Sequence, residues 1–260
     1  MYTQLPRPAI FAHRGASAYA PENTLAAFEL AVRQNADAIE LDAKLSADEH
    51  VVVIHDQTVD RTTDGSGRVS DLPLSALQEL DAGRSYDKAF RHEPIPTLGE
   101  VFETVGRQIL INVELTNYLS PNNALPEKVA ELVRQHNIVQ HVMFSSFNPL
   151  ALRRIHRQLP DVPLGLLAFQ GRSGAWARSW LGRWVPFQAL HPAAIDTCPR
   201  LIQQQQARGF RVHTYTVNTS DDMQRFFEWG IDGIFTDDTP LAQSVRSDVS
   251  RRNRRIQNSV

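Results

Sequence analysis

The 260-residue sequence has one cysteine, three lysines and no long apolar run. The single cysteine, Cys198, excludes an internal disulfide framework and a metal site built from several thiolates. The longest apolar stretches, such as residues 164–169, are much shorter than the roughly 18 residues of a membrane-spanning helix. The first residues also lack the apolar core of a secretory signal, so we expect a cytoplasmic protein.

The sequence has no large excess of charge of either sign. The 27 Lys and Arg residues nearly balance 29 Asp and Glu, and the net charge of −2 gives no reason to expect a nucleic acid as partner. With 42% apolar and 22% charged residues, the composition is that of an ordinary globular protein. Disorder, collagen and coiled coil are therefore excluded.

Short apolar runs alternate with segments of helical spacing along most of the chain. Apolar strands are expected at residues 9–13, 38–41, 51–54, 109–113, 141–145, 164–169, 210–217 and 233–236. Helices are expected at residues 24–33, 126–135, 149–158, 200–208, 221–229 and from about 239. About eight strands joined by helices predict a closed (β/α)₈ barrel, or TIM barrel. A doubly wound open sheet is the alternative, but its Gly-x-Gly-x-x-Gly turn is missing after the first strand.

Two segments interrupt this alternation. Residues 58–96 are polar, rich in turns and too long for an ordinary connection, so we expect a small insertion after the second or third strand, folded over one end of the barrel. Otherwise we expect one domain over residues 1–260, with a flexible tail at 247–260. Residues 171–187 carry Trp176, Trp180 and Trp184, which a helix would place on one face. We favour packing for these indoles. Contact with a lipid surface is the alternative, because arginines flank them.

Polar side chains end several of the predicted strands, and in a parallel barrel these ends meet at one rim. His13 ends the first strand, Glu40 and Asp42 the second, His55 the third and Glu114 the fourth. Glu40 and Asp42 are two residues apart, so both carboxylates point to the same side of a strand. Burying such charges separately would cost several kcal/mol each, so we expect them to share one site.

These residue types suit the cleavage of a phosphate ester. Three carboxylates without a thiolate offer hard oxygen ligands, which Mg²⁺ or Ca²⁺ prefers more than zinc does. Two histidines titrate near neutral pH and can exchange protons. The cation would stabilise charge on the non-bridging phosphate oxygens, one imidazole would activate the nucleophile, and the other would protonate the leaving alkoxide.

Several short segments carry a resemblance to a known family. In chain order they are His13-Arg14-Gly15, Pro21-Glu22-Asn23-Thr24, Glu40-Leu41-Asp42, His55-Asp56, Arg61-Thr62-Thr63 with Gly65, Asn112-Val113-Glu114-Leu115, Thr216-Val217-Asn218 and Gly233-Ile234-Phe235-Thr236-Asp237. Together they resemble the glycerophosphodiester phosphodiesterase family from about residue 9 to residue 242. The His-Arg-Gly segment alone would be a weak signal, but the ordered set is specific.

The resemblance implies a TIM barrel with an insertion after the His-Asp strand. It implies hydrolysis of a glycerophosphodiester, a small molecule, to sn-glycerol 3-phosphate and an alcohol, a reaction of lipid and glycerol metabolism. It assigns the acid–base roles to His13 and His55, the phosphate contact to Arg14, and one divalent cation, Mg²⁺ or Ca²⁺, to Glu40, Asp42 and Glu114. Attack by the glycerol 2-hydroxyl through a cyclic phosphate is one route described for such enzymes. Which histidine is the base stays open.

Two positions depart from the family's pattern. Many members carry lysine two residues after the third carboxylate, where this chain has Thr116. A cation that could neutralise phosphate is therefore expected to be missing, which leaves the substrate preference open. Many members also carry tryptophan before the Thr-Val-Asn segment, where this chain has Tyr215. A phenol can still line the pocket for the alcohol and adds a hydrogen-bonding tip, so we expect Tyr215 to contact substrate.

Other residues and functions are kept as alternatives. We expect Asn23 and Asp56 to support the site from behind, and Asp237 to be either a helix cap or a site residue. His213 is interpreted as structural, whereas His191 is a lesser candidate for the site. A lysophospholipase D-type enzyme acting on lysolipids is the alternative function. A non-catalytic phosphate-binding module would require a broken histidine pair, and both histidines are present. The oligomeric state stays open.

Overall fold

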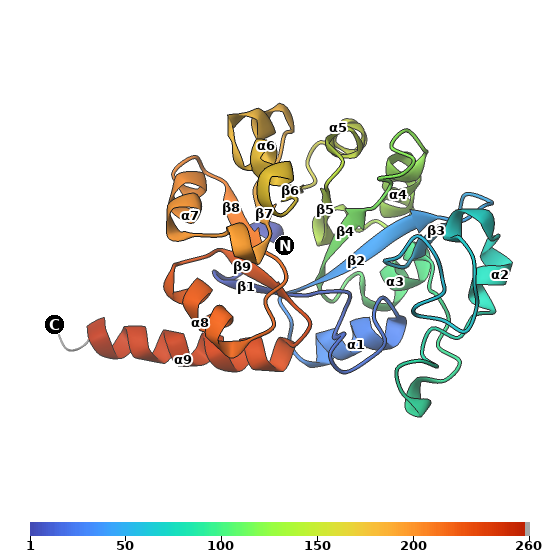
Figure 1. Cartoon of the computed structure of the whole chain (residues 1–260), viewed down its shortest axis with the longest axis horizontal. Helices are drawn as coiled ribbons and strands as arrows, with labels where there is room; N and C mark the ends of the chain where they lie inside the picture. The colour runs from blue at the N-terminus through green and yellow to red at the C-terminus, as the bar shows by residue number, and fades with distance from the viewer. Residues whose placement is uncertain (258–260) are drawn as a thin grey trace.

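Eight short strands run parallel and hydrogen-bond in a closed circle, with the last strand paired to the first. In order around the barrel they are β1 (Ala9–Ala12), β2 (Ala38–Leu45), β4 (Leu110–Leu115), β5 (Val142–Ser146), β6 (Leu164–Ala168), β7 (Ala189–Pro192), β8 (Arg211–Thr214) and β9 (Gly233–Thr236). Nearly every strand residue is buried, as expected where helices cover the outer side of a parallel sheet. The computed structural model, which describes residues 1–257, confirms the predicted (β/α)₈ barrel (Figure 1).

Helices form a ring around the strands in Figure 1. They are α1 (Leu25–Arg33), α3 (Leu98–Val105), α4 (Leu125–Gln135), α5 (Pro149–Gln158), α6 (Ala175–Arg178), α7 (Pro199–Gln206), α8 (Ser220–Glu228) and α9 (Thr239–Gln257). Side chains cap the first turns, whose N–H groups have no partner in the helix. Thr24 accepts from Ala27 N, and Asn148 accepts from Leu150 N. Within residues 1–257, no helix is both long and apolar enough to cross a membrane.

Aromatic and aliphatic side chains close the barrel at the amino-terminal ends of its strands. This cluster combines the N-terminal segment with the inner faces of the strands and includes Tyr2, Phe11, Leu110, Met143 and Phe235. His191 and His213 join it, both fully buried, with Nε2 of His191 3.3 Å from Nδ1 of His213. The interpretation of His213 as structural is confirmed. His191 lies in this same cluster, which forms the floor of the barrel, and it does not line the cavity at the rim. The interpretation of His191 as a candidate site residue is therefore wrong.

The strand expected at residues 51–54 is not a member of the barrel. β3 (Val51–Val53) pairs antiparallel with the outer half of β2, with Val53 opposite Ala43, while β2 pairs directly with β4. The chain thus reverses its direction after β2, and β3, which lies outside the ring of barrel strands, leads to His55 at the rim. The prediction of a parallel strand ending at this residue is wrong, because a short buried apolar run looks the same in either direction.

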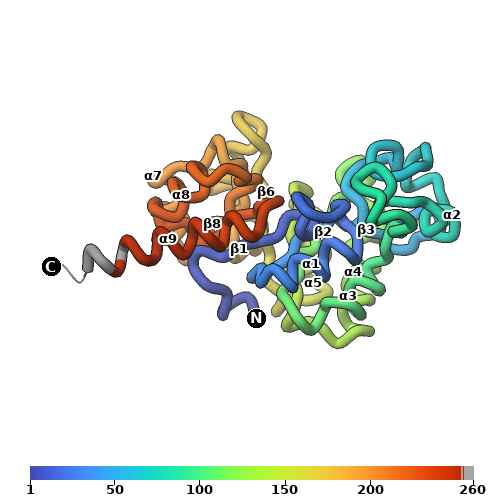
Figure 2. Tube along the Cα trace, turned by 90° about the horizontal axis from the view of Figure 1, so that it is seen from below, coloured from blue at the N-terminus to red at the C-terminus, as the bar shows by residue number. Residues whose placement is uncertain are grey.

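Residues 58–96 leave the barrel between β3 and α3. They contain the helix α2 (Leu74–Gln78) and the 3₁₀ turns η2 (Val69–Asp71) and η3 (Lys88–Phe90). Together with β3 they bury an apolar cluster of their own: Val52, Ile54, Val59, Val69, Leu77, Ala82 and Ile95. Figures 1 and 2 show this segment, around the label α2, at one edge of the molecule. At the other edge, α9 extends into the expected tail and includes residues 247–257. The last three residues of that tail, 258–260, lie outside the described part of the chain.

Residues 171–187 do not form one helix. A 3₁₀ turn η5 (Gly171–Gly174), the short α6 and a second 3₁₀ turn η6 (Trp180–Trp184) follow one another, and Ser179 between the last two is extended. The three indoles therefore do not share a helical face. Trp176 packs against the core, whereas Trp180 is 73% exposed and Trp184 is 53% exposed. The packing interpretation holds for Trp176 and is wrong for the other two.

Candidate active site

Three carboxylates meet at the carboxyl-terminal ends of β2 and β4. Glu40 and Asp42 alternate with apolar residues along β2 and so share its inner face. The register of β2 and β4 places Asp42 directly opposite Glu114. One oxygen from each of the three carboxylates lies within 4.8 Å of the others, and Glu40 and Asp42 are buried. The structure thus brings together the three residues that the sequence analysis assigned to a cation.

Each of these carboxylates has a hydrogen-bond donor that orients it. The donors are the backbone N–H of Arg14 to Glu40 Oε2 at 2.9 Å, Asn23 Nδ2 to Asp42 Oδ2 at 2.9 Å, and the Tyr118 hydroxyl to Glu114 Oε1. Asn23 adopts a positive φ of 59°, which asparagine tolerates better than most residues, and this turns its amide toward β2. Sequence reasoning missed Tyr118, because it lies in an irregular loop after β4 where no periodicity gives its direction.

Burial and crowding make three negative charges costly here in the absence of a cation. Burial first, and then the charge on Asp42, raises the pKa of Glu114 to about 8. The same causes raise the pKa of Glu40 well above its usual range. A divalent cation among the oxygens would remove this cost. Three carboxylates without a thiolate are the ligand set that Mg²⁺ and Ca²⁺ prefer, so the residues fit a hard divalent cation.

Arg14 directs its guanidinium into the cavity from a tight turn. Its φ is 56°, and Gly15 follows at 82°, where a Cβ would also lie 2.7 Å from that of Ala27. Arg14 Nη1 donates to Glu22 Oε1 at 2.9 Å, and its Nε lies 3.6 Å from Asp42 Oδ2. This Nε is buried without a hydrogen-bond partner among the described residues. An unpartnered charged donor beside the carboxylates is suited to a phosphate oxygen.

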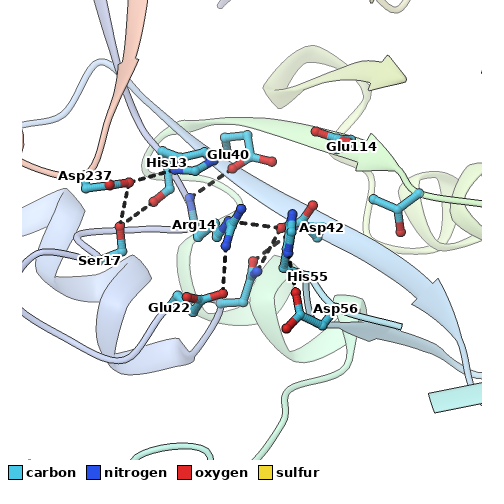
Figure 3. Close-up of polar contacts among 12 residues, drawn as sticks. His13, Arg14, Ser17, Glu22, Glu40, Asp42, His55, Asp56, Glu114 and Asp237 are labelled. Atoms are coloured by element: carbon cyan, nitrogen blue, oxygen red, sulfur yellow. Dashed lines mark hydrogen bonds and ion pairs between the residues drawn. The ribbon is translucent and has the colours of Figure 1, made fainter. Parts of the chain in front are cut away.

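His13 and His55 are each held by a carboxylate through Nδ1. His13 Nδ1 lies 2.7 Å from Asp237 Oδ1, and His55 Nδ1 lies 2.7 Å from Asp56 Oδ1. Because an ionised carboxylate only accepts hydrogen bonds, both Nδ1 atoms carry a proton, and Nε2 is left to exchange one. Figure 3 shows the guanidinium of Arg14 between the two imidazoles. Asp237 is thus a partner of a site residue as well as a residue that precedes a helix.

Further hydrogen bonds keep the two aspartates ionised. Arg61 Nε donates to Asp56 Oδ2 at 2.6 Å, and this bond is the main reason that the pKa of Asp56 falls to about 2. Burial alone would raise the pKa of Asp237, but the bonds from His13 and from Asn218 Nδ2, at 2.6 Å, outweigh it and lower the pKa. Each imidazole therefore has an ionised carboxylate as the partner of its Nδ1.

Arg61 also connects the insertion with the phosphate site. Its Nη1 and Nη2 donate to the two carboxylate oxygens of Glu22, both at 2.8 Å. Glu22 in turn accepts the hydrogen bond from Arg14. Arg61 and Glu22 belong to the segments that carry the family resemblance, but sequence reasoning gave them no role. The structure shows that they link Asp56 to Arg14.

These groups line a cavity of about 250 Å³ at the rim of the barrel. All seven residues predicted for the site lie on its wall: His13, Arg14, Glu40, Asp42, His55, Glu114 and Tyr215. Part of the lining is apolar and includes Phe147, Leu167 and Phe235, which sequence reasoning did not identify. The Tyr215 hydroxyl donates to Ala168 O at 2.7 Å, so this phenol is fixed to the wall. The cavity thus has a charged half and an apolar half.

A lysine from another position contacts Thr116, the position at which many family members carry a lysine themselves. Lys44 follows Asp42 by two residues on the same face of β2 and donates Nζ to Thr116 Oγ1 at 2.6 Å. It is buried, and burial lowers the pKa of its ammonium. Lys44 does not line the active-site cavity, so the expectation that a phosphate-neutralising cation is missing stays a prediction.

A barrel whose rim combines ligands for a hard cation with two histidines has the groups that cleavage of a phosphate ester requires. A sequence model of the glycerophosphoryl diester phosphodiesterase family matches residues 13–241. This span includes every residue of the site and nearly the whole chain. The chain belongs to this family and is an enzyme, a phosphoric diester hydrolase.

Individual relatives and solved structures agree with this assignment. The chain is 39% identical over 230 residues to a glycerophosphodiester phosphodiesterase of Caldanaerobacter subterraneus, covering 88% of this chain and 93% of the relative. It is 32% identical over 246 residues to one of Bacillus altitudinis, covering 92% and 98%. A phosphodiesterase of Oleispira antarctica, solved with the product sn-glycerol-3-phosphate, matches with a TM-score of 0.83 at 30% identity, covering 94% of this chain and 98% of that one.

Proposed function

We propose that the chain hydrolyses glycerophosphodiesters to sn-glycerol 3-phosphate and an alcohol, with one divalent cation and a pair of histidines. Membership of the family and the product bound to the Oleispira antarctica structure support this substrate class. Glu40, Asp42 and Glu114 would hold Mg²⁺ or Ca²⁺. When bound, such a cation stabilises negative charge on the non-bridging oxygens of the phosphate.

The observation that carries the mechanism is the placement of two aspartate-held imidazoles on either side of Arg14 (Figure 3). Arg14 binds the phosphate through its guanidinium, which lines the cavity. The apolar half of the cavity and Tyr215 receive the carbon portion of the substrate. The phosphate is thereby oriented between two groups that can move protons.

The two imidazoles divide the proton transfers between them. The attacking hydroxyl, from water or from C2 of the substrate's own glycerol, gives its proton to Nε2 of one imidazole as its oxygen bonds to phosphorus. The bond between phosphorus and the leaving oxygen breaks, and the other imidazole, protonated on both nitrogens, donates its Nε2 proton to that oxygen. Attack by the 2-hydroxyl gives a cyclic phosphate, which water opens with the two roles exchanged.

The test is an assay for sn-glycerol 3-phosphate released from glycerophosphocholine, glycerophosphoethanolamine and glycerophosphoglycerol. We expect EDTA to abolish release and Mg²⁺ or Ca²⁺ to restore it. His13→Gln and His55→Gln should each lower kcat by about 10²–10⁴. His50→Gln is the matched control, because this histidine is exposed and outside the cavity, and it should keep full turnover.

Full turnover of either active-site variant would contradict the acid–base roles, and full turnover in EDTA would contradict the cation. The circular dichroism of each variant should match that of the parent. A loss of activity without a loss of structure then reports on chemistry.

Cleavage of lysolipids by the same groups is a second candidate, which one contact favours. Phe147 on the cavity wall stacks on Phe169, with ring centroids 4.1 Å apart and an angle of 19° between the planes. Phe169 is 46% exposed, so the apolar half of the cavity continues to the surface, where an acyl chain could lie. Mass spectrometry distinguishes the two functions, because a lysolipid yields lysophosphatidic acid instead of glycerol 3-phosphate.

We also propose that the chain is one barrel domain over residues 1–260 with a folded insertion at 58–96. The insertion's own apolar cluster and the bonds of Arg61 support this division. The cytoplasmic location and the flexibility of residues 247–260 stay predictions.

A further inference from the structure

Large apolar side chains are exposed on the rim that surrounds the cavity. The loops and helix starts that follow β5, β6 and β7 expose six of them by 44% to 75%, and we call this set the rim patch: Leu150, Phe169, Trp180, Leu181, Trp184 and Ile195. Leu150, Phe169 and Ile195 lie within four residues of the carboxyl end of a barrel strand, at the same end as the active site, and the other three lie on the connection from β6 to β7. In Figure 2 the gold segment beyond β6 projects on the side opposite the N-terminus.

Polar contacts, and not burial of the indoles, hold this part of the rim in place. Arg178 donates to Phe169 O at 2.8 Å, to Gly171 O at 2.5 Å and to Asp196 Oδ2 at 3.0 Å, which joins the loops after β6 and β7. The guanidinium of Arg153 on α5 stacks 4.2 Å from the ring centre of Trp184. The rim patch therefore lies on a fixed framework that leaves its apolar side chains in solvent. Such exposed apolar surface commonly marks an interaction site.

Arginines outnumber acidic residues around the rim patch. Residues 147–188 contain six arginines and a single acidic residue, Asp161. Arg178 is neutralised by an ion pair with Asp196. Arg172 and Arg183 are exposed and form no ion pair with any residue in the described part of the chain. An apolar surface next to unpaired arginines matches the interface of a membrane with anionic headgroups.

We propose that the rim patch docks the enzyme on a lipid bilayer that carries anionic headgroups, with the active-site cavity facing the lipid. Trp180 and Trp184 lie at the level of the headgroups. There the apolar part of an indole contacts the acyl chains, and its N–H contacts the polar headgroups. Arg172 and Arg183 bind the anionic headgroups. The stack of Phe169 on Phe147 connects the docked surface with the apolar half of the cavity. This inference stands apart from the proposed function, because its test is binding.

The test is co-sedimentation of the full chain with vesicles of phosphatidylcholine alone or of phosphatidylcholine mixed with phosphatidylglycerol. We expect binding to the mixed vesicles only, weaker at high salt, with a blue shift of the tryptophan emission. The double variant Trp180→Ser/Trp184→Ser should bind at least about tenfold less. Arg172→Gln/Arg183→Gln should lose about fivefold for each arginine.

The matched control is Arg107→Gln/Arg208→Gln, which removes two exposed arginines from the opposite end of the barrel and should bind like the parent. The circular dichroism of all variants should match that of the parent, which shows that the fold is intact. Absence of binding to mixed vesicles overturns the proposal. Full binding by the tryptophan variant, or an equal loss in the control, overturns it as well.

Discussion

Mild acid should destabilise this barrel through two histidines buried in its floor. His191 and His213 are fully buried against each other and against aromatic rings. Burial lowers the pKa of His191 to about 3. Burial first, and then the neighbouring His191, lowers the pKa of His213 well below its usual range. Both rings therefore stay neutral in the folded protein under conditions where exposed histidines take up a proton.

The sign of the effect follows from proton binding. An unfolded chain binds a proton at each histidine with a pKa of about 6.5, whereas the folded chain does not until about pH 3 for His191. The unfolded state thus holds more protons between these values, and the free energy of unfolding falls as the pH falls below about 6.5. At about pH 5 the neutral ring of His191 costs about 2 kcal/mol, and His213 adds a cost of the same sign. This is a large part of a typical total of about 5–15 kcal/mol.

Urea unfolding followed by tryptophan fluorescence at pH 7 and pH 5 measures this loss. His191→Gln and His213→Gln should each be less stable than the parent at pH 7, because the rings fill the floor. Each should nevertheless lose less stability than the parent between the two pH values, by about 2 kcal/mol for His191→Gln. His50→Gln, at an exposed position, should show the parent's loss. An equal loss in the parent and both floor variants would refute the reasoning.

Two further predictions concern the cavity. Asp237→Asn should lower kcat by about 10²–10⁴ with little change in KM, because an amide can also donate to Nδ1 and no longer fixes the tautomer of the imidazole. Steady-state kinetics over a range of pH measures this, and a change confined to KM would contradict the role. Lys44→Met removes the buried ammonium at nearly constant volume, and we expect kcat/KM to fall about tenfold or more. Adding Thr116→Lys should restore part of the loss, and no recovery would argue against a shared role for the two positions.

The acidic cluster could be predicted from sequence because it depends on local rules. Glu40 and Asp42 share a face through the two-residue period of a strand, and strand ends meet at one rim in any parallel barrel. The direction of β3 could not be predicted, because three valines fit a parallel or an antiparallel strand equally well. His55 lines the cavity as expected, but the strand before it, β3, is not a strand of the barrel.

Contacts set by register or close packing were also beyond the sequence pattern. Lys44 reaches Thr116 because the register of β2 and β4 pairs Ala43 with Leu115, a fact that neither segment shows alone. The spacing of the tryptophans predicts a common face only if one helix continues through all three. A Cβ on Gly182 would lie 2.4 Å from the carbonyl oxygen of Ala177, so the chain folds back on itself too closely for one helix.

The balance of charge in the cavity connects the proposed cation with the binding of substrate. Six carboxylates belong to the site and its supporting contacts: Glu22, Glu40, Asp42, Asp56, Glu114 and Asp237. Among the described residues, three cationic side chains oppose them: Arg14, Lys44 and Arg61. Burial, and after it the neighbouring carboxylates, raises the pKa of Glu40 and of Glu114. A phosphodiester anion would be repelled from such a site. A divalent cation and one protonated imidazole make up the missing positive charge, so cation and substrate should each strengthen the binding of the other.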